Sequence, residues 1–198
     1  MPKAEFLFDF GSPNAYLAHR VLPEIEARTG VRFDYTPVLL GGLFKLTGIQ
    51  APMLAFANIP NKLAYEMLEL RRFVERHKIA FQMNPFFPVN TLLLMRGAVA
   101  AELDGVLPAY AEAGFHHMWE APKKVDDPAV WAEAMAASGL DAERLLARTK
   151  DDDVKAKLLA NTEAAAKRGA FGIPTFYVDD EIYFGKNTLR EVEDALTA

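Results

Sequence analysis

Two short segments, one near each end of the chain, place the strongest limits on how this sequence can fold. The apolar run Glu5–Phe10 passes directly into Gly11-Ser12-Pro13, a sequence suited to a turn that opens a helix. Much later, Ile173-Pro174-Thr175 leads into the apolar run Phe176–Val178. Both runs have the length and apolar character of buried strands. The sequence therefore predicts a sheet to which both ends of the chain contribute.

The first forty residues read as a strand, a helix and a second strand. Residues 13–28 have helical character, Ser12 is a good N-cap, and Gly30 is suited to close the helix. Val31–Tyr35 then alternates apolar and polar residues, which is typical of a strand. A strand–helix–strand unit over about 30 residues predicts two parallel strands joined by a crossover.

The middle of the chain lacks strand signals and is punctuated by glycine and proline. The spacing of apolar residues and the capping residues predict a series of helices, beginning near Pro60, Asn90, Pro108, Asp127 and Asp141. We therefore expect residues 39–150 to form a helical insertion domain. The rest, 1–38 and 151–198, is expected to form one discontinuous α/β domain.

The last fifty residues return to the α/β pattern. A helix is expected over 151–168, followed by a hairpin that pairs Thr175–Val178 with Ile182–Phe184. Thr188-Leu189-Arg190-Glu191 has the spacing of a capping box, so we expect the Thr188 side chain to cap the final helix.

The composition excludes several classes of function. The chain of 198 residues has a net charge of −5, which gives no reason to expect a nucleic acid or an anionic membrane as partner. No stretch approaches the roughly 18 to 20 apolar residues that span a bilayer, and no signal peptide is evident, so we expect a cytoplasmic protein. The absence of cysteine excludes disulfides and thiol catalysis by the chain itself. The four histidines lack the spacing of metal ligands, so no metal is expected.

The Ser12 hydroxyl is the first candidate for chemistry. At the start of a helix it faces unpaired backbone N–H groups and the positive end of the helix dipole. One interpretation is that Ser12 only caps the helix, and the other is that its hydroxyl donates a hydrogen bond to a bound thiolate. A serine hydrolase is disfavoured. The chain has no Gly-x-Ser-x-Gly motif, and Pro13 has no backbone N–H for an oxyanion hole.

Three motifs, in order along the chain, carry a resemblance to a known family. They are Phe8–Pro13, Phe171–Thr175 and Phe184–Asn187. In these motifs the chain resembles the 2-hydroxychromene-2-carboxylate isomerases, relatives of the kappa-class glutathione transferases within the DsbA-like thioredoxin superfamily. Redox members of that superfamily read Cys-Pro-x-Cys where this chain has Ser12 and Ala15 in place of the cysteines. The resemblance implies an α/β, thioredoxin-like fold with a helical insertion domain, and an active site in the cleft between the two parts.

The resemblance also implies a glutathione-dependent isomerase that acts in the breakdown of aromatic hydrocarbons. The glutathione thiolate would add reversibly to a small, aromatic-derived conjugated substrate, and the Ser12 hydroxyl would stabilise that thiolate. The Ile173-Pro174 peptide is expected to be cis and to bind the glutathione backbone along an open strand edge. Further glutathione contacts are implied for Lys62, Asn187 and Thr188, substrate contacts for Lys45, Asn58 and Phe87, and a homodimer for the assembly.

The physical demand on Ser12 is modest. A free thiol with a pKa of about 8.5 is only a few per cent thiolate at neutral pH. Lowering that pKa by about 2 requires about 2.7 kcal/mol. One charge-assisted hydrogen bond supplies about 1.5–3 kcal/mol, and a helix dipole supplies about 0.3–1 kcal/mol. Ser12 would then act as a donor to the thiolate and not as the attacking atom.

The chain departs from the family pattern where the γ-glutamyl end of glutathione is expected. Many members read Gly-x-Asp-Arg where this chain reads Gly185-Lys186-Asn187-Thr188, so an acid–base pair for that end is missing. Asn187 and Thr188 are also explained as helix caps, and Phe87 as core packing. Two other functions stay open: a kappa-class-like glutathione transferase or peroxidase, and a non-catalytic glutathione- or peptide-binding protein.

Overall fold

The sheet contains strands from both ends of the chain, as expected. The computed structural model describes residues 2–198. Its four strands lie in the order β2-β1-β3-β4, with β1 parallel to β2 and antiparallel to β3, and β3 antiparallel to β4. The strands are β1 (Ala4–Phe8), β2 (Phe33–Pro37), β3 (Thr175–Val178) and β4 (Glu181–Phe184). The predicted parallel pair and the predicted hairpin are therefore both present.

The first two strands are shifted from their predicted ranges. The first strand ends at Phe8 because Asp9 and Phe10 already belong to a turn, in which the Ser12 N–H donates to the Asp9 carbonyl over 3.1 Å. The second strand starts at Phe33, the residue that pairs with Ala4, two residues later than expected. The turn after Phe8 therefore carries Ser12 clear of the sheet.

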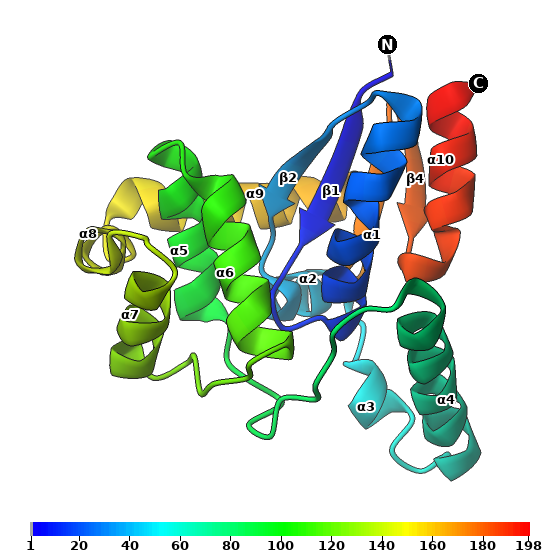
Figure 1. Ribbon diagram of the computed structural model, residues 1–198, viewed down its shortest axis with the longest axis horizontal. Helices are drawn as coiled ribbons and strands as arrows, with labels where there is room; N and C mark the ends of the chain where they lie inside the picture. The colour runs from blue at the N-terminus through cyan, green and yellow to red at the C-terminus, as the bar shows by residue number, and fades with distance from the viewer. Residues whose placement is uncertain (1) are drawn as a thin grey trace.

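Helix α1 (Pro13–Thr29) begins and ends where the sequence predicts. The Ser12 Oγ accepts a hydrogen bond from the Ala15 N–H over 3.2 Å, and Gly30 closes the helix in the left-handed conformation with φ of 75°. In Figure 1, α1 and α10 (Leu189–Thr197) lie side by side against the sheet, while α9 (Asp152–Lys167) runs behind it.

The middle of the chain is helical, and residues 39–150 contain no strand in the part that the structure describes. Its helices are α2 (Leu40–Thr47), α3 (Pro52–Ala55), α4 (Pro60–His77), α5 (Leu92–Leu103), α6 (Leu107–Trp119), α7 (Pro128–Ala137) and α8 (Ala142–Arg148). Figure 1 shows α5 to α8 as a block on one side of the sheet. It shows α2, α3 and α4 at the end of the sheet where β1 ends and α1 begins. The division into two domains at residues 38 and 150 stays a prediction.

Two predicted helix caps differ in detail from the structure. Helix α5 has Thr91 as its N-cap and not Asn90, although the Asn90 Oδ1 does accept a hydrogen bond from the Leu92 N–H over 3.0 Å. Thr188 forms no capping box, because its hydroxyl donates to the Gly185 carbonyl over 2.9 Å instead. That bond closes a short 3-10 turn, η1 (Lys186–Thr188), which precedes α10.

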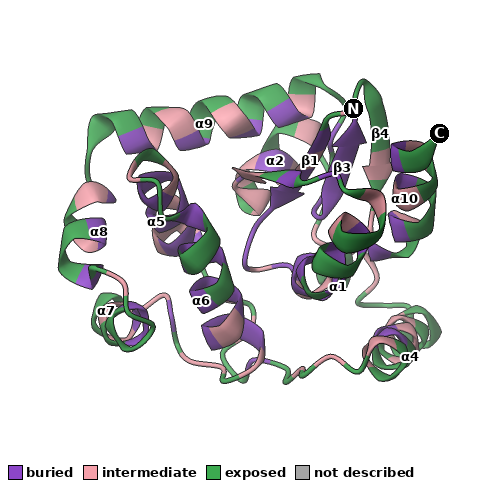
Figure 2. Cartoon of the chain, turned by 45° about the horizontal axis from the view of Figure 1, so that its top comes forward, coloured by how far each residue is buried: buried purple, intermediate pink, exposed green. Residues whose placement is uncertain are grey.

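A single hydrophobic cluster runs from the sheet into the helical block. Buried residues cover the central strands and the inner sides of α5 and α6 (Figure 2). Aromatic rings join the two parts: the Phe8 ring of β1 lies 5.8 Å from the Phe115 ring of α6, and Phe10 meets Phe115 edge-on at 4.8 Å. Among residues 2–198, no helix is both long enough and apolar enough to cross a membrane.

Gly114 of α6 allows this close packing, and we expect Gly114→Ala to destabilise the protein. A Cβ there would lie 2.4 Å from Cε1 of Phe10, so helix and ring must separate. Overpacking of this kind costs about 1–3 kcal/mol. The control is Gly41→Ala in α2, where a Cβ has open space and alanine favours the helix. Urea denaturation should show a lower midpoint for Gly114→Ala only, and equal midpoints for both variants would contradict this packing.

Candidate functional site

Ser12 and Ile173 lie together, although 161 residues separate them in the sequence. Ser12 is 5% exposed, and its hydroxyl donates to the Ile173 carbonyl over 2.9 Å and accepts from the Ala15 N–H. The Ile173-Pro174 peptide is cis, as predicted. Ser12 is therefore both a helix cap and a partner of the late segment, so the two interpretations of its hydroxyl are compatible.

The backbone of Ile173 offers an unused donor beside that hydroxyl. Within residues 2–198, the Ile173 N–H donates no hydrogen bond, while its carbonyl accepts the one from Ser12. Nearby, the rings of Phe171 and Phe184 are packed at 4.5 Å and are each about 40% exposed. Gly172 allows this packing, since a Cβ there would lie 2.8 Å from a Phe184 ring atom. The unpaired Ile173 N–H can bind the backbone of an extended peptide ligand, and the two exposed rings can contact an apolar group of that ligand.

The motif after β4 is tied to this segment, but its side chains point elsewhere. The Gly185 N–H donates to the Pro174 carbonyl over 2.9 Å, which places η1 beside the cis peptide. Asn187 is exposed and, with Lys186, lines a cavity of about 250 Å³ between α1, α4 and α10. That cavity does not include Ser12 or Ile173. The Thr188 hydroxyl is engaged within η1.

Lys186 is a charged residue with almost no exposure. Its side chain is 3% exposed, its Nζ lies 2.5 Å from the Glu69 Oε2 of α4, and it sits 5.2 Å from the centre of the Phe73 ring. The pair connects α4 to η1. The sequence showed a lysine next to the expected γ-glutamyl position, but not that its charge is directed toward α4.

The remaining predicted site residues surround the Ser12 end of the sheet without touching Ser12. Lys62 pairs with Glu66 over 3.1 Å, Lys45 is exposed in the last turn of α2, and Asn58 is exposed after α3. Phe87 is half-buried, with its ring 5.8 Å from that of Trp119. Within residues 2–198, no hydrogen bond or ion pair joins any of these four side chains to Ser12, and their roles stay predictions.

Asp9 and Trp119 hold the turn that carries Ser12, and sequence reasoning assigned neither a role there. The Asp9 carboxylate is fully buried and accepts hydrogen bonds from the Gly11 and Leu40 N–H groups. Burial raises the pKa of the Asp9 carboxyl, and these bonds partly offset that effect. The Trp119 Nε1–H donates to the Phe10 carbonyl over 2.8 Å. The sequence did contain one sign of a role for Asp9, since it is a charged residue inside the apolar run Phe6–Phe10.

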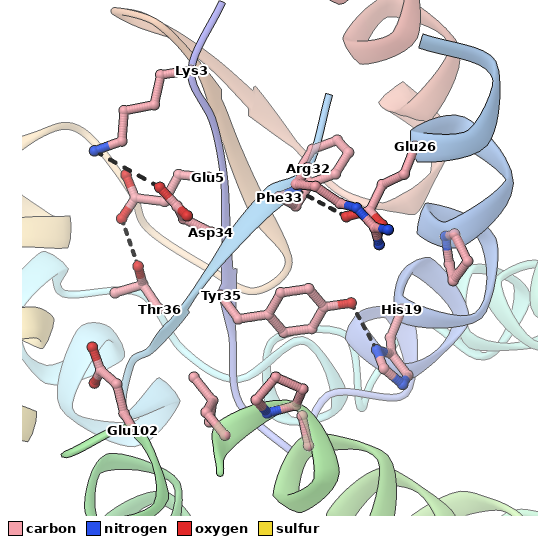
Figure 3. Close-up of a pocket in the computed structure, with 14 residues that line it drawn as sticks. Lys3, Glu5, His19, Glu26, Arg32, Phe33, Asp34, Tyr35, Thr36 and Glu102 are labelled. Carbon is pink, nitrogen blue, oxygen red and sulfur yellow. Dashed lines mark hydrogen bonds and ion pairs between the residues drawn. The ribbon is translucent and has the colours of Figure 1, made fainter. Parts of the chain in front are cut away.

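A larger cavity, of about 670 Å³, lies between β2, α1 and α6 and also excludes Ser12 and Ile173 (Figure 3). Several of its polar side chains are already paired, although Glu102 Oε2 has no hydrogen-bond partner within residues 2–198. The Tyr35 hydroxyl lies 2.8 Å from Nδ1 of His19, and the Glu5 carboxylate accepts from the Thr36 hydroxyl over 2.8 Å. This cavity therefore does not contain the contact between Ser12 and Ile173, where the resemblance places the active site.

His19 lowers the pKa of the Glu112 carboxyl, and this predicts a pH dependence of stability. The hydrogen bond from His19 lowers the pKa of Glu112 to about 2, from an ordinary value near 4.5. A lowered carboxyl pKa adds stability above pH 4.5 that is lost as the pH falls toward 2. We expect Glu112→Gln to lose less stability than the wild type between pH 5 and 3 in urea denaturation. The effect should be small, because the Glu112 side chain is 57% exposed.

The control for that titration is Glu133→Gln, since Glu133 is exposed in α7 and forms no ion pair within residues 2–198. A Glu112→Gln profile that runs parallel to the wild type would contradict the assignment.

The histidines form no metal site in the part of the chain that the structure describes, where no group of three or more potential ligands is suitably placed. The adjacent His116 and His117 contact different partners. His116 Nδ1 lies 3.1 Å from a Glu120 carboxylate oxygen, and His117 Nε2 lies 2.9 Å from the Ser138 hydroxyl.

Comparison with known protein families gives one match over nearly the whole chain, the DSBA-like thioredoxin domain, at residues 4–197. Among curated proteins, a 2-hydroxychromene-2-carboxylate isomerase of Sphingobium xenophagum is 27% identical over 199 residues, which cover 97% of this chain and 96% of that protein. Glutathione S-transferase kappa 1 of Rattus norvegicus is 26% identical over 201 residues, covering 94% of this chain and 87% of that protein.

Solved structures give the same fold. A 2-hydroxychromene-2-carboxylate isomerase superposes with a TM-score of 0.85 at 23% identity, covering 98% of this chain and 93% of the other. A probable DsbA oxidoreductase from Streptomyces coelicolor superposes with a TM-score of 0.73 at 19% identity, covering 100% and 89%. The predicted thioredoxin-like fold with a helical insertion is confirmed.

Proposed function

This chain belongs to the DSBA-like thioredoxin family, and on that premise we propose that it is a glutathione-dependent isomerase of the 2-hydroxychromene-2-carboxylate isomerase type. The observation that carries the proposal is the contact of the Ser12 hydroxyl with the Ile173 carbonyl at the start of α1. It joins a proton donor, a helix N-terminus and a partly unpaired backbone segment in one place.

The residues present at this point fit glutathione. The chain contains no cysteine, so a thiol must come from a ligand, and glutathione when bound supplies that thiol as its nucleophile. Ile173 would hold the peptide backbone through its free N–H and its carbonyl. Asn187 would meet the γ-glutamyl end, where the nearby Lys186 is already paired with Glu69. Lys62 and Thr188 complete the proposed set.

The Ser12 hydroxyl has a single proton, so it can donate only one hydrogen bond at a time and must change acceptor when a ligand binds. In the structure that proton is donated to the Ile173 carbonyl. Once a peptide N–H satisfies that carbonyl, the Ser12 hydroxyl is free to turn and donate to a sulfur anion. The Ala15 N–H still donates to the Ser12 Oγ and holds the side chain in place. Ser12 therefore stabilises charge and does not attack the substrate.

The proposed substrate-binding surface consists of exposed aromatic rings near Ile173. The Phe171 and Phe184 rings are each about 40% exposed beside Ile173, which suits a small aromatic-derived substrate. Lys45, Asn58 and Phe87 are proposed to complete that side. A homodimer and a cytoplasmic location belong to the same proposal.

A second candidate is a kappa-class-like glutathione transferase or peroxidase, which the similarity to the rat protein favours. It would use the same Ser12 and Ile173 groups toward a different electrophile. A protein that binds glutathione or a peptide without turnover is the third.

Thiolate absorbance of glutathione, titrated with the wild-type protein in excess, tests the proposal. We expect a thiol pKa about 2 below the free value of about 8.5. A thiol that titrates as in free solution would refute an activating site. Interconversion of hydroxychromene carboxylates, compared with conjugation of a generic electrophile, then separates the isomerase from the transferase.

A further inference from the structure

We propose that Asp9 is a positioning residue that fixes the Ser12 hydroxyl by joining three segments around it. Asp9 is fully buried at the end of β1, three residues before Ser12. Within residues 2–198, no cation is paired with its carboxylate. A buried charge without a counter-ion is costly, and it is tolerated where surrounding donors satisfy it.

Three donors from different segments converge on the Asp9 carboxylate. Its Oδ1 accepts from the Gly11 N–H over 2.8 Å. Its Oδ2 accepts from the Leu40 N–H over 2.8 Å and from the Thr91 hydroxyl over 3.1 Å. The Asp9 carbonyl also accepts from the Ser12 N–H. Both the main chain and the side chain of Asp9 therefore hold the turn that ends in Ser12.

The two distant donors stand at the starts of helices. Leu40 is the first residue of α2, and Thr91 is the N-cap of α5. Neither helix has a side-chain hydrogen bond from its own N-cap residue, Leu39 or Thr91. Asp9 satisfies the Leu40 N–H from outside the helix, and its negative charge is favourable at both helix starts. One carboxylate thus sets the Ser12 turn relative to α2 and α5.

The charge of Asp9 alone would work against the proposed chemistry. A carboxylate near Ser12 disfavours a second negative charge there and would raise the pKa of a bound thiol. Its benefit must therefore come from geometry. Asparagine at position 9 would aim its NH₂ group either at the Gly11 N–H or at the Leu40 N–H and the Thr91 hydroxyl, because an amide has one acceptor oxygen and a carboxylate has two. Asp9→Asn removes both the charge and the fixed turn, and these two losses shift a bound thiol in opposite directions.

The first test uses the ligand-free protein and the carbonyl ¹³C resonance of Ile173. Within residues 2–198 no hydrogen bond joins Asp9 to Ile173, whereas the Ser12 hydroxyl donates to the Ile173 carbonyl, so that resonance reports on how Ser12 is held. In Asp9→Asn we expect it to move most of the way to its position in Ser12→Ala. The control is Tyr110→Phe, which removes a buried hydroxyl bonded to the Leu94 carbonyl. A wild-type Ile173 resonance in Asp9→Asn would overturn the proposal.

The second test rests on the proposed function and measures the pKa of the thiol of bound glutathione. Positioning by Asp9 predicts a rise of about 1 in Asp9→Asn. A net fall or no net change in Asp9→Asn would mean that loss of the fixed turn does not outweigh the opposing effect of losing the charge, and either result overturns the proposal. Thr91→Val removes one donor and should give the same shifts at reduced size even if Asp9→Asn folds poorly. If the wild type binds no glutathione, the proposed function fails, and the Ile173 resonance still decides on Asp9.

Discussion

Ser12→Ala should raise the pKa of the thiol of bound glutathione by about 1 to 2, back toward the free value. The variant removes one charge-assisted hydrogen bond, worth about 1.5–3 kcal/mol, and each pKa unit corresponds to about 1.4 kcal/mol. The isomerase rate should fall about 10- to 100-fold. Thiolate absorbance measures the first effect, and steady-state assay measures the second.

Loss of the helix cap must be separated from loss of the donor, because the Ser12 Oγ also accepts from the Ala15 N–H. Asp141→Ala is the matched control, since it removes the cap of α8, where the Asp141 carboxylate accepts from the Arg144 N–H. Each variant should lose about 1 kcal/mol of stability. Only Ser12→Ala should change the thiol pKa. If it leaves that pKa unchanged, Ser12 is a helix cap and nothing more.

Glu69→Ala should lower the free energy of unfolding by about 3 kcal/mol, the largest stability effect we expect. It leaves the Lys186 ammonium, which is 3% exposed, without its partner. Removing one member of a buried ion pair costs about 3–5 kcal/mol, and the 29% exposure of Glu69 places this case at the lower end. Urea denaturation measures the change.

The double variant Glu69→Leu with Lys186→Met is the control for that prediction. It removes both charges and keeps apolar volume against Phe73, so it should recover most of the lost stability. A double variant as unstable as Glu69→Ala would show that the ammonium was not the cause. Because the pair joins α4 to η1, backbone amides of α4 should also exchange faster in Glu69→Ala.

The sequence predicted most of the fold because its local signals agree with the tertiary structure. Gly30 closes α1, and Asp127 and Asp141 cap α7 and α8, as expected, and apolar runs mark β1 and β3. Thr188 was misassigned because its hydroxyl has two possible partners. It bonds back to Gly185 and not forward into α10, and only the packed turn decides between these partners.

The candidate site was predicted in part. Ser12 was singled out by its place at a helix start and Ile173 by the family resemblance, and strand pairing brings their two turns together. Side-chain direction was beyond the sequence: Lys186 turns toward Glu69, and Phe87 packs on Trp119. The role of Asp9 also depends on Leu40 and Thr91, which lie far from it in the sequence. Such three-way contacts leave no periodic signal.

The order of the strands sets when the site can form during synthesis. Strand β1 lies between β2 and β3, and β3 begins only at Thr175. A ribosome that adds about 5–20 residues per second needs roughly 8–30 s to pass from Ser12 to Ile173. Until then, one side of β1 has no strand partner, and an unpaired strand edge is prone to aggregation. Expression yield should therefore depend on how well the nascent chain is shielded, more than on the stability of the finished protein.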